Sequence, residues 1–138
     1  MANNTIGIDV GGTKVLGGVV SESGEILTTA RRDTPREGGR ALTQAIADVA
    51  NELAHEFPVD SIGVSAAGFI SSDRKTILAT PNIAGWNGVN LDRELNEILG
   101  KTIVLENDAN AAAWGEFKFG AGRGRNDLML LTLGTGVG

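Results

Sequence analysis

TIGIDVGGTKVLGGVV, residues 5–20, holds two short apolar runs separated by a pair of glycines. The runs at 5–10 and 15–20 are rich in Ile and Val, and such runs are typical of buried strands. A turn, SESGE, leads to a third run, ILTTARRDT (26–34). Three successive strands with tight turns predict an antiparallel meander, which begins the fold.

A helix is expected after the meander, over residues 38–57. Apolar residues recur there at helical spacing, and Pro58 follows the last of them. They are Leu42, Ile46, Val49, Leu53 and Phe57. A single apolar stripe along a helix is typical of packing against a sheet.

The rest of the chain alternates strands with helices. The expected elements are a strand within 60–70, a helix at 89–100, a strand at 101–106, a helix at 107–120 and a strand at 128–134. Asn90 is placed to cap the second helix, and Gly100 is placed to end it. Three strands followed by alternating helices and strands predict an α/β fold.

The composition is that of one ordinary globular domain. The chain has 138 residues, of which 41% are hydrophobic and 21% are charged, close to the averages of folded domains. It has no cysteine and one histidine, His55, which excludes a disulfide framework, a thiolate metal site and a histidine cluster for zinc within it. His55 lies away from the apolar stripe of its helix and is expected at the surface. Trp86 and Trp114 are expected to pack in the core, and a position beside a ligand is the alternative for each.

Charge and hydropathy exclude two classes of partner. The net charge is −5 and the Lys and Arg residues are scattered, so the chain lacks the basic patch of a nucleic-acid binder. No apolar run reaches the roughly 18 residues of a membrane span. The first residues, MANNTIGID, lack the basic and long apolar regions of a signal peptide. We therefore expect no nucleic-acid partner, no membrane partner and a cytoplasmic location.

Glycine is the over-represented residue, and one glycine pair lies in the segment GIDVGGTK (7–14) between the first two strands. This context does not fit a dinucleotide-binding fingerprint, whose glycines open a helix, or a P-loop with its fixed spacing. Gly11 and Gly12 instead present bare backbone amides that can hold an anion. Thr13 adds a hydroxyl and Lys14 a positive charge. A plain hairpin turn is the alternative.

A second turn of this kind occurs in LTLGTGVG (131–138), again after an expected strand. It also offers bare amides and one hydroxyl. Two such turns in one chain are less expected by accident than one, which favours phosphate binding over two plain hairpins.

Polar side chains are expected to gather near these turns. Asp9 ends the first strand as a carboxylate that can hold Mg²⁺ directly or through water. In LENDANAAAWGE (105–116), Asn107 and Asp108 stand where a strand meets a helix. Ligands of open α/β sheets gather beyond the carboxyl ends of the strands, so both side chains should point into a cleft. Capping of the helix is the alternative explanation for both.

Together, the three stretches resemble the N-terminal part of sugar kinases of the ROK family, within the actin, hexokinase and Hsp70 superfamily. IGIDVGGTK is similar to the family's first phosphate loop, ENDANAAAWGE to its catalytic segment and LTLGTGVG to its second phosphate loop. The resemblance runs from Ile6 to Gly138 and is strongest to bacterial glucokinases. It implies an actin-like, ribonuclease H-like fold: a mixed five-stranded sheet that includes the meander, helices on both faces, and the first strand of a second similar domain.

The resemblance also implies a division of the chain. Residues 1–120 are the implied sugar-kinase domain, and residues 121–138 are the implied connection and start of a nucleotide domain. Relatives carry a structural zinc site beyond the second phosphate loop, past the last residue of this chain. The chain is therefore expected to be a fragment with little or no turnover alone, and the whole enzyme is expected to be a homodimer.

Roles for individual residues follow from the same resemblance. Asp108 is the implied catalytic base, facing the primary hydroxyl of the sugar. The residues implied to bind sugar hydroxyls are Gly68, Asn82, Asn107 and Asp108. The residues implied to face the phosphates of ATP are Gly11, Gly12, Thr13, Lys14, Thr135 and Gly136, and Asp9 is implied to lie near Mg²⁺. One departure concerns the sugar loop, where this chain has Ala67 and many relatives have proline.

The implied activity is transfer of the γ-phosphate of ATP to the 6-hydroxyl of glucose. Another hexose or an N-acetylhexosamine stays open as the substrate, and polyphosphate stays open as the donor. Two other function classes are a non-catalytic sugar-binding module and a sugar-responsive repressor of the same family. A repressor would carry a DNA-binding helix-turn-helix ahead of the first phosphate loop, where five residues precede Ile6.

Overall fold

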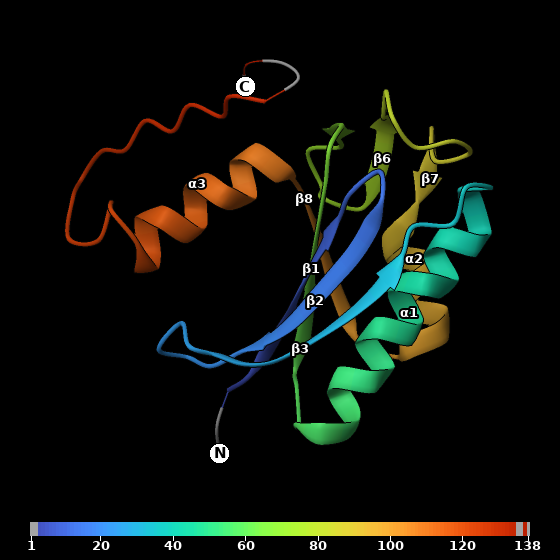
Figure 1. Cartoon of the computed structure of the whole chain (residues 1–138), viewed down its shortest axis with the longest axis horizontal. Coiled ribbons are helices and arrows are strands. Elements are labelled where there is room, and N and C mark those ends of the chain that lie inside the picture. Colours follow the sequence, from blue (N-terminus) through green and yellow to red (C-terminus); the bar gives the residue numbers. More distant parts are fainter. Residues whose placement is uncertain (1–2, 135–136, 138) are drawn as a thin grey trace.

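The computed structural model describes residues 3–134 and residue 137. Within them, a mixed five-stranded sheet packs against helices, and a separate three-stranded sheet lies toward one end of it (Figure 1). The predicted α/β fold is confirmed. In this described part of the chain, no helix is long and apolar enough to cross a membrane.

The large sheet starts with the predicted meander. Its strands are β1 (Thr5–Val10), β2 (Lys14–Val20) and β3 (Ile26–Asp33), and each pairs antiparallel with the next in the chain. Two further strands, β4 (Ser61–Ala66) and β8 (Thr102–Asn107), run parallel to β1 and to each other. The order across the sheet is β3-β2-β1-β4-β8, so the carboxyl ends of β1, β4 and β8 share one edge.

One face of this sheet is buried by helix α1 (Gly39–Glu56). Burial alternates along β1, where every second residue is buried and the intervening residues are exposed, as expected for a strand with one covered face. Gly17 on β2 lets the helix approach closely, because a Cβ there would lie 2.5 Å from Cγ1 of Val49. The buried apolar side chains of α1 are Leu42, Ala45, Ile46, Ala47, Val49, Ala50 and Leu53.

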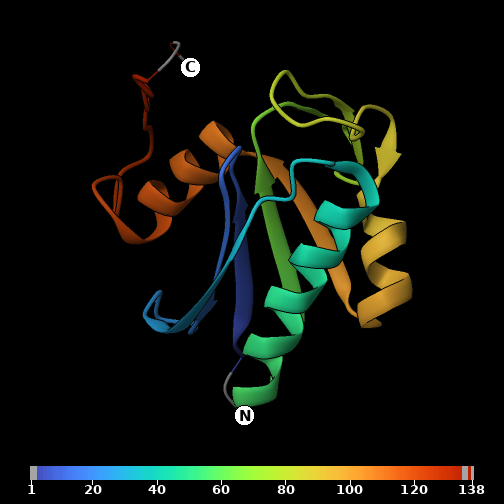
Figure 2. The ribbon, with the colours of Figure 1, turned by 45° about the vertical axis from the view of Figure 1, so that its right-hand side comes forward.

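Helix α2 (Leu91–Leu99) lies beside α1 on the same face (Figure 2). Its predicted ends are confirmed. The side chain of Asn90 accepts a hydrogen bond of 2.9 Å from the amide of Arg93, and Gly100 takes the left-handed conformation, with φ 60°, that ends many helices.

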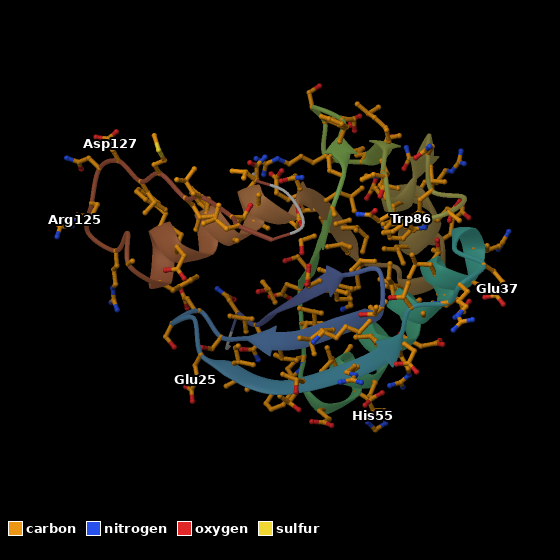
Figure 3. All side chains as sticks on the ribbon, turned by 45° about the horizontal axis from the view of Figure 1, so that its top comes forward. Glu25, Glu37, His55, Trp86, Arg125 and Asp127 are labelled. Carbon is orange, nitrogen blue, oxygen red and sulfur yellow. The ribbon has the colours of Figure 1, made fainter. Side chains whose placement is uncertain are left out.

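The two tryptophans differ in their surroundings. Trp86 is fully buried, as expected, and its Nε1 donates a 3.3 Å hydrogen bond to the carbonyl of Gly39. Figure 3 shows Trp86 inside the molecule and His55 on its outer surface, in agreement with both predictions. The core position predicted for Trp114 is wrong: 63% of this side chain is exposed, on a helix that buries no residue.

The small sheet was not expected from the sequence. It consists of β5 (Phe69–Ile70), β6 (Thr76–Ala79) and β7 (Val89–Asn90), paired antiparallel in the order β5-β6-β7. Two of its strands have only two residues, which is too short for a periodic pattern. Ile77 on β6 is fully buried and anchors this sheet to the core.

Helix α3 (Asp108–Phe119) lies over the opposite face of the large sheet from α1 and α2 (Figure 2). Helices therefore flank both faces, as expected. The cover is partial, because a cavity of about 1020 Å³ opens between α3 and the sheet. Its lining includes Gly7 and Gly63 of the sheet and Trp114 and Phe117 of the helix.

The strand predicted at residues 128–134 is wrong. After the end of α3 the chain turns back, and this segment runs outside the sheet toward the start of the helix, with a single bridge between Leu133 and Val137 (Figure 1). A strand forms where a neighbour bonds its backbone amides and carbonyls, and no described strand lies beside this segment. The division of the chain at residue 120 stays a prediction.

Candidate active site

Three strands of the large sheet each place a polar residue at the shared carboxyl edge. Asp9 on β1 pairs in register with Ser65 on β4, and Ser65 pairs with Glu106 on β8. Residues paired in register project from the same face of a sheet. The row Asp9, Ser65, Glu106 therefore lies on the face away from α1, beside the carboxyl ends of the strands, where ligands of α/β sheets bind.

Two members of the row, Asp9 and Ser65, share a cavity with the predicted catalytic residue. Ser65 Oγ donates a 2.8 Å hydrogen bond to Oδ1 of Asp9, and the described residues give the Asp9 carboxylate no other hydrogen bond. A cavity of about 480 Å³ is lined by Asp9, Ser65, Asp108 and Thr132 with neighbouring alanines of α3. The residues predicted for metal binding and for catalysis are thus brought to one site.

Asp108 is the first residue of α3 and is exposed. One carboxylate oxygen, Oδ1, accepts a 2.9 Å hydrogen bond from the amide of Ala109. In the described part of the chain no basic side chain pairs with it. A carboxylate at this position is favoured by the positive end of the helix dipole and remains open to the cavity.

Asn107 caps α3, so the capping alternative is confirmed for this residue. Its Oδ1 accepts hydrogen bonds from the amides of Ala109 and Asn110, at 3.0 and 3.2 Å. Its Nδ2 donates to the carbonyl of Gly68 at 2.9 Å. Because an amide nitrogen has two hydrogens, one donor of Asn107 is left for a ligand.

Of the residues predicted to bind sugar hydroxyls, the structure joins Gly68 to Asn107 but leaves Asn82 apart from them. Gly68 is required by close packing, because a Cβ there would lie 2.5 Å from the carbonyl oxygen of Ala79. Asn82 is exposed on the loop after β6. Among the described residues it makes no hydrogen bond with Asn107 or Asp108, and it does not line the cavity that Asp9 and Asp108 share.

The first glycine turn is held by hydrogen bonds to Thr34, and it is open to solvent at Gly12. The amide of Gly11 donates to the carbonyl of Lys14 at 2.9 Å, so the prediction that Gly11 presents a bare amide is wrong. Thr34 holds the turn, because its Oγ1 donates to the carbonyl of Gly11 at 2.7 Å and its amide donates to the carbonyl of Thr13 at 3.0 Å. A Cβ at Gly12 would meet no atom within 4 Å.

Gly12 is therefore not needed for the packing of the described chain, and its φ lies outside the left-handed region. An anion held close against the backbone does explain a residue without a side chain. The turn thus fits a phosphate group, with the Lys14 charge beside it.

The second glycine turn is described only in part. Thr135 and Gly136, both predicted to face phosphates, lie outside the described residues. Thr132 lies just before them and lines the cavity with Asp9 and Asp108. The segment that leads to the second turn therefore reaches the same site.

A metal at this site would need ligands beyond the carboxylates of the described residues. The described residues contain no group of three or more His, Cys, Asp and Glu side chains placed to hold an ion. Mg²⁺ characteristically uses one or two carboxylates and completes its shell with water and substrate phosphates. Asp9, with one hydrogen bond from Ser65, fits that use.

Sequence reasoning missed three residues of this region: Ser65, Glu106 and Arg74. Ser65 and Glu106 stand at outward-facing positions one residue before the ends of their strands, a signal that alternation along the strands would have given. Arg74 lies in the turn between β5 and β6 of the small sheet, and these strands are too short to show a periodic pattern. Its guanidinium pairs with Glu106 at 3.3 Å.

A mixed sheet with carboxylates at its carboxyl edge, beside a glycine turn and a helix start, defines an α/β domain of the kind whose ligands bind at that edge. The chain belongs to the ROK family, whose model matches residues 5–138.

Its relatives include sugar kinases. The chain is 42% identical over 134 residues to the glucokinase of Streptomyces coelicolor, covering 97% of this chain and 42% of that protein. It is 35% identical over 133 residues to the N-acetylmannosamine kinase of Yersinia pseudotuberculosis, covering 96% of this chain and 45% of that protein.

A solved structure is also similar. The ROK family glucokinase of Streptomyces griseus, in complex with glucose and AMPPNP, matches with a TM-score of 0.91 and 43% identity. The match covers 99% of this chain and 43% of that chain. The chain therefore spans less than half the length of these relatives.

Proposed function

We propose that the complete protein, meaning the protein that contains this chain, is a sugar kinase. It transfers the γ-phosphoryl group of ATP to the 6-hydroxyl of glucose and yields glucose 6-phosphate. The observation that carries the proposal is the single cavity lined by Asp9 and Asp108. Membership of the ROK family and the similarity to glucokinases give the reaction its class.

Asp108 acts as the base in this proposal. Phosphoryl transfer passes through a loose transition state, so the protein mainly positions the groups and stabilises charge. The attacking hydroxyl becomes acidic late in the reaction and then needs an acceptor for its proton. A carboxylate at a helix start is a well-placed proton acceptor, and among the described residues the Asp108 carboxylate accepts one hydrogen bond, from the amide of Ala109.

The sugar is assigned to the side of the cavity near Gly68 and Asn107. Asn107 has one free amide donor beyond its cap and its bond to Gly68. A site built to pair with hydroxyls rejects analogues that leave its polar groups unpaired. Asn82 is retained as a sugar ligand in the proposal, and it has to approach the cavity when sugar binds.

The phosphates of ATP are assigned to Gly11, Gly12, Thr13 and Lys14, with Thr135 and Gly136 from the second turn. The Asp9 carboxylate, oriented by Ser65, holds Mg²⁺ directly or through water. When bound, Mg²⁺ supplies positive charge that neutralises the phosphate oxygens. The chain's own part is to hold one wall of that site in a fixed position through Thr34.

Glucose is proposed as the substrate because a glucokinase is the relative with 42% identity, although an N-acetylmannosamine kinase also matches at 35%. Cytoplasmic location, a homodimeric state and the structural zinc of the remaining part stay predictions. A non-catalytic sugar-binding module is the alternative that the experiment below separates from a kinase.

The test combines a coupled phosphorylation assay with calorimetric titration of the complete protein. The panel holds glucose, mannose and N-acetylmannosamine, each with ATP and with polyphosphate. A matched control, 6-deoxyglucose, lacks the accepting hydroxyl and is expected to bind without being phosphorylated. Phosphorylation of glucose with ATP supports the proposal. Glucose binding without turnover under any donor would favour the binding module, and preference for another sugar would correct the substrate.

A further inference from the structure

The hairpin that follows the sugar loop reaches across to the catalytic segment. Strand β5 begins at Phe69, directly after Gly68, and the hairpin tip spans residues 71–75. At that tip, the carbonyl of Arg74 accepts a 3.1 Å hydrogen bond from the amide of Leu105 on β8. The Nη2 atom of Arg74 lies 3.3 Å from Oε2 of Glu106.

The same glutamate holds the start of α3 with its other oxygen. Oε1 of Glu106 accepts a 2.9 Å hydrogen bond from the amide of Asn107 and a 3.2 Å bond from Nδ2 of Asn110. These two residues flank Asp108 in the sequence and in the first turn of the helix. By the hydrogen bonds and ion pairs of the described residues, the Glu106 side chain joins the hairpin tip to the helix start.

We propose that Arg74 and Glu106 are positioning residues, which set the Asp108 carboxylate and the Gly68 loop at a fixed distance from each other. This inference rests on the proposed function, because it gives Asp108 the role of base. The pair acts through Asn107 and Asn110 and does not touch the substrate. Asn107 completes the connection through its bond to the Gly68 carbonyl.

The conformation of Arg74 supports a purpose beyond the folding of the turn. Its φ of 58° lies in the left-handed region, and it is the only residue other than glycine with a positive φ among the described residues. Glycine would take this conformation without strain. An arginine there supplies a charged group that glycine cannot, and that group is directed at Glu106.

The exposure of the pair argues that its effect is on geometry more than on stability. The Arg74 side chain is 61% exposed and that of Glu106 is 25% exposed. Ion pairs at such exposure contribute little to folding. Small displacements of a catalytic group nevertheless cost large factors in rate.

The matched control is Lys75, the next residue of the same hairpin tip. Its Nζ pairs with Asp92 of α2 at 3.8 Å, and its side chain is 54% exposed. None of the ion pairs or hydrogen bonds of the described residues joins the Lys75 side chain to α3. Lys75→Ala therefore removes a charge from the hairpin without loosening the helix start.

The experiment compares Arg74→Gly, Glu106→Gln, Glu106→Ala, the double variant R74G/E106Q and Lys75→Ala in the complete protein. We expect kcat to fall about tenfold in R74G and in E106Q, with Tm within about 5 °C of the parent. The double variant should fall no further than either single, because each removes the same interaction. E106A, which also frees the helix start, should fall about a hundredfold. K75A should keep its kcat.

The positioning role of Arg74 and Glu106 would be overturned if the losses of kcat in R74G and E106Q added up in the double variant. It would also be overturned if K75A lost as much kcat as R74G. A second readout does not depend on activity: hydrogen exchange at the amides of Asn107, Ala109 and Asn110 in the 138-residue chain. Exchange should speed up in R74G and E106A but not in K75A. If the parent protein phosphorylates no sugar, the proposed function fails. Unchanged exchange in R74G and E106A would separately reject the positioning role of Arg74 and Glu106.

Discussion

The side-chain nitrogen Nδ2 of Asn107 donates a 2.9 Å hydrogen bond to the carbonyl of Gly68, and the side-chain oxygen Oδ1 of Asn107 caps α3. One side chain thus links the predicted sugar loop to the helix that carries Asp108. Helix caps and local loop contacts of this kind usually contribute to stability as well as to geometry.

Replacing Asn107 separates the two contributions. Asn107→Ala removes both, and we expect it to lower the free energy of unfolding by about 1–2 kcal/mol in urea titrations. Asn107→Ser keeps a capping oxygen but has no amide to reach Gly68, so it should lose less than half of that. Equal losses in the two variants would show that the bond to Gly68, not the cap, carries the stability.

Replacing each of two glycines of the site with alanine should have different effects: a loss of stability at Gly68 and a weaker use of ATP at Gly12. Gly68→Ala brings a Cβ to 2.5 Å from the Ala79 carbonyl oxygen, and overpacking of this kind costs about 1–3 kcal/mol of stability. Gly12→Ala meets no atom within 4 Å, so its unfolding midpoint should stay near that of the parent. In the complete protein, however, G12A should raise the KM for ATP, because the methyl group occupies the space assigned to phosphate. An unchanged KM for ATP would contradict the assignment of this turn.

Ser65 should tune the metal requirement. Ser65→Ala removes the 2.8 Å hydrogen bond to Asp9, which leaves the carboxylate free to rotate. We expect the Mg²⁺ concentration for half-maximal rate to rise several-fold while the KM for sugar stays within twofold, measured by titrating Mg²⁺ at saturating ATP. A rise in sugar KM with no change in Mg²⁺ dependence would place Ser65, and Asp9 with it, on the sugar side.

The two tryptophans offer a test of the fold that needs no substrate. Trp86 is 0% exposed and Trp114 is 63% exposed, so iodide should quench the fluorescence of Trp86→Phe, which retains Trp114, and hardly affect Trp114→Phe. Trp114 lies 5.4 Å from the ammonium of Lys118 and stacks on Phe117 at 6.0 Å. Equally weak quenching in the two variants would mean that α3 packs more closely than the structure shows, and equally strong quenching would contradict the burial of Trp86.

The large sheet and its helices were predictable because their patterns are local and long enough to read. Alternation along β1, the stripe of α1 and the end signals of α2 at Asn90 and Gly100 all agree with the structure. The small sheet was missed because two of its strands have two residues each. Residues 128–134 have the composition of a strand but, in the described chain, no neighbouring strand to bond.

The candidate site was predicted in outline. Asp9 and Asp108 line one cavity, which follows from the rule that loops after parallel strands share an edge. The supporting contacts of Ser65, Thr34 and Glu106 depend on register and on loop paths, which the sequence patterns do not specify. Asn107 illustrates the limit: capping and sugar binding were both reasonable, and the hydrogen bonds confirm the cap and leave sugar binding as a proposal.

The central claim is that Asp108 accepts the proton of the sugar hydroxyl, and Asp108→Asn in the complete protein tests it most directly. The substitution is nearly isosteric and keeps an oxygen that can accept from the amide of Ala109. Calorimetry should give a glucose Kd within a few-fold of the parent, and the coupled assay should show kcat lowered by about a hundredfold or more, in keeping with the loss of a positioned proton acceptor. A variant that binds glucose and keeps a near-normal kcat would remove Asp108 from the reaction.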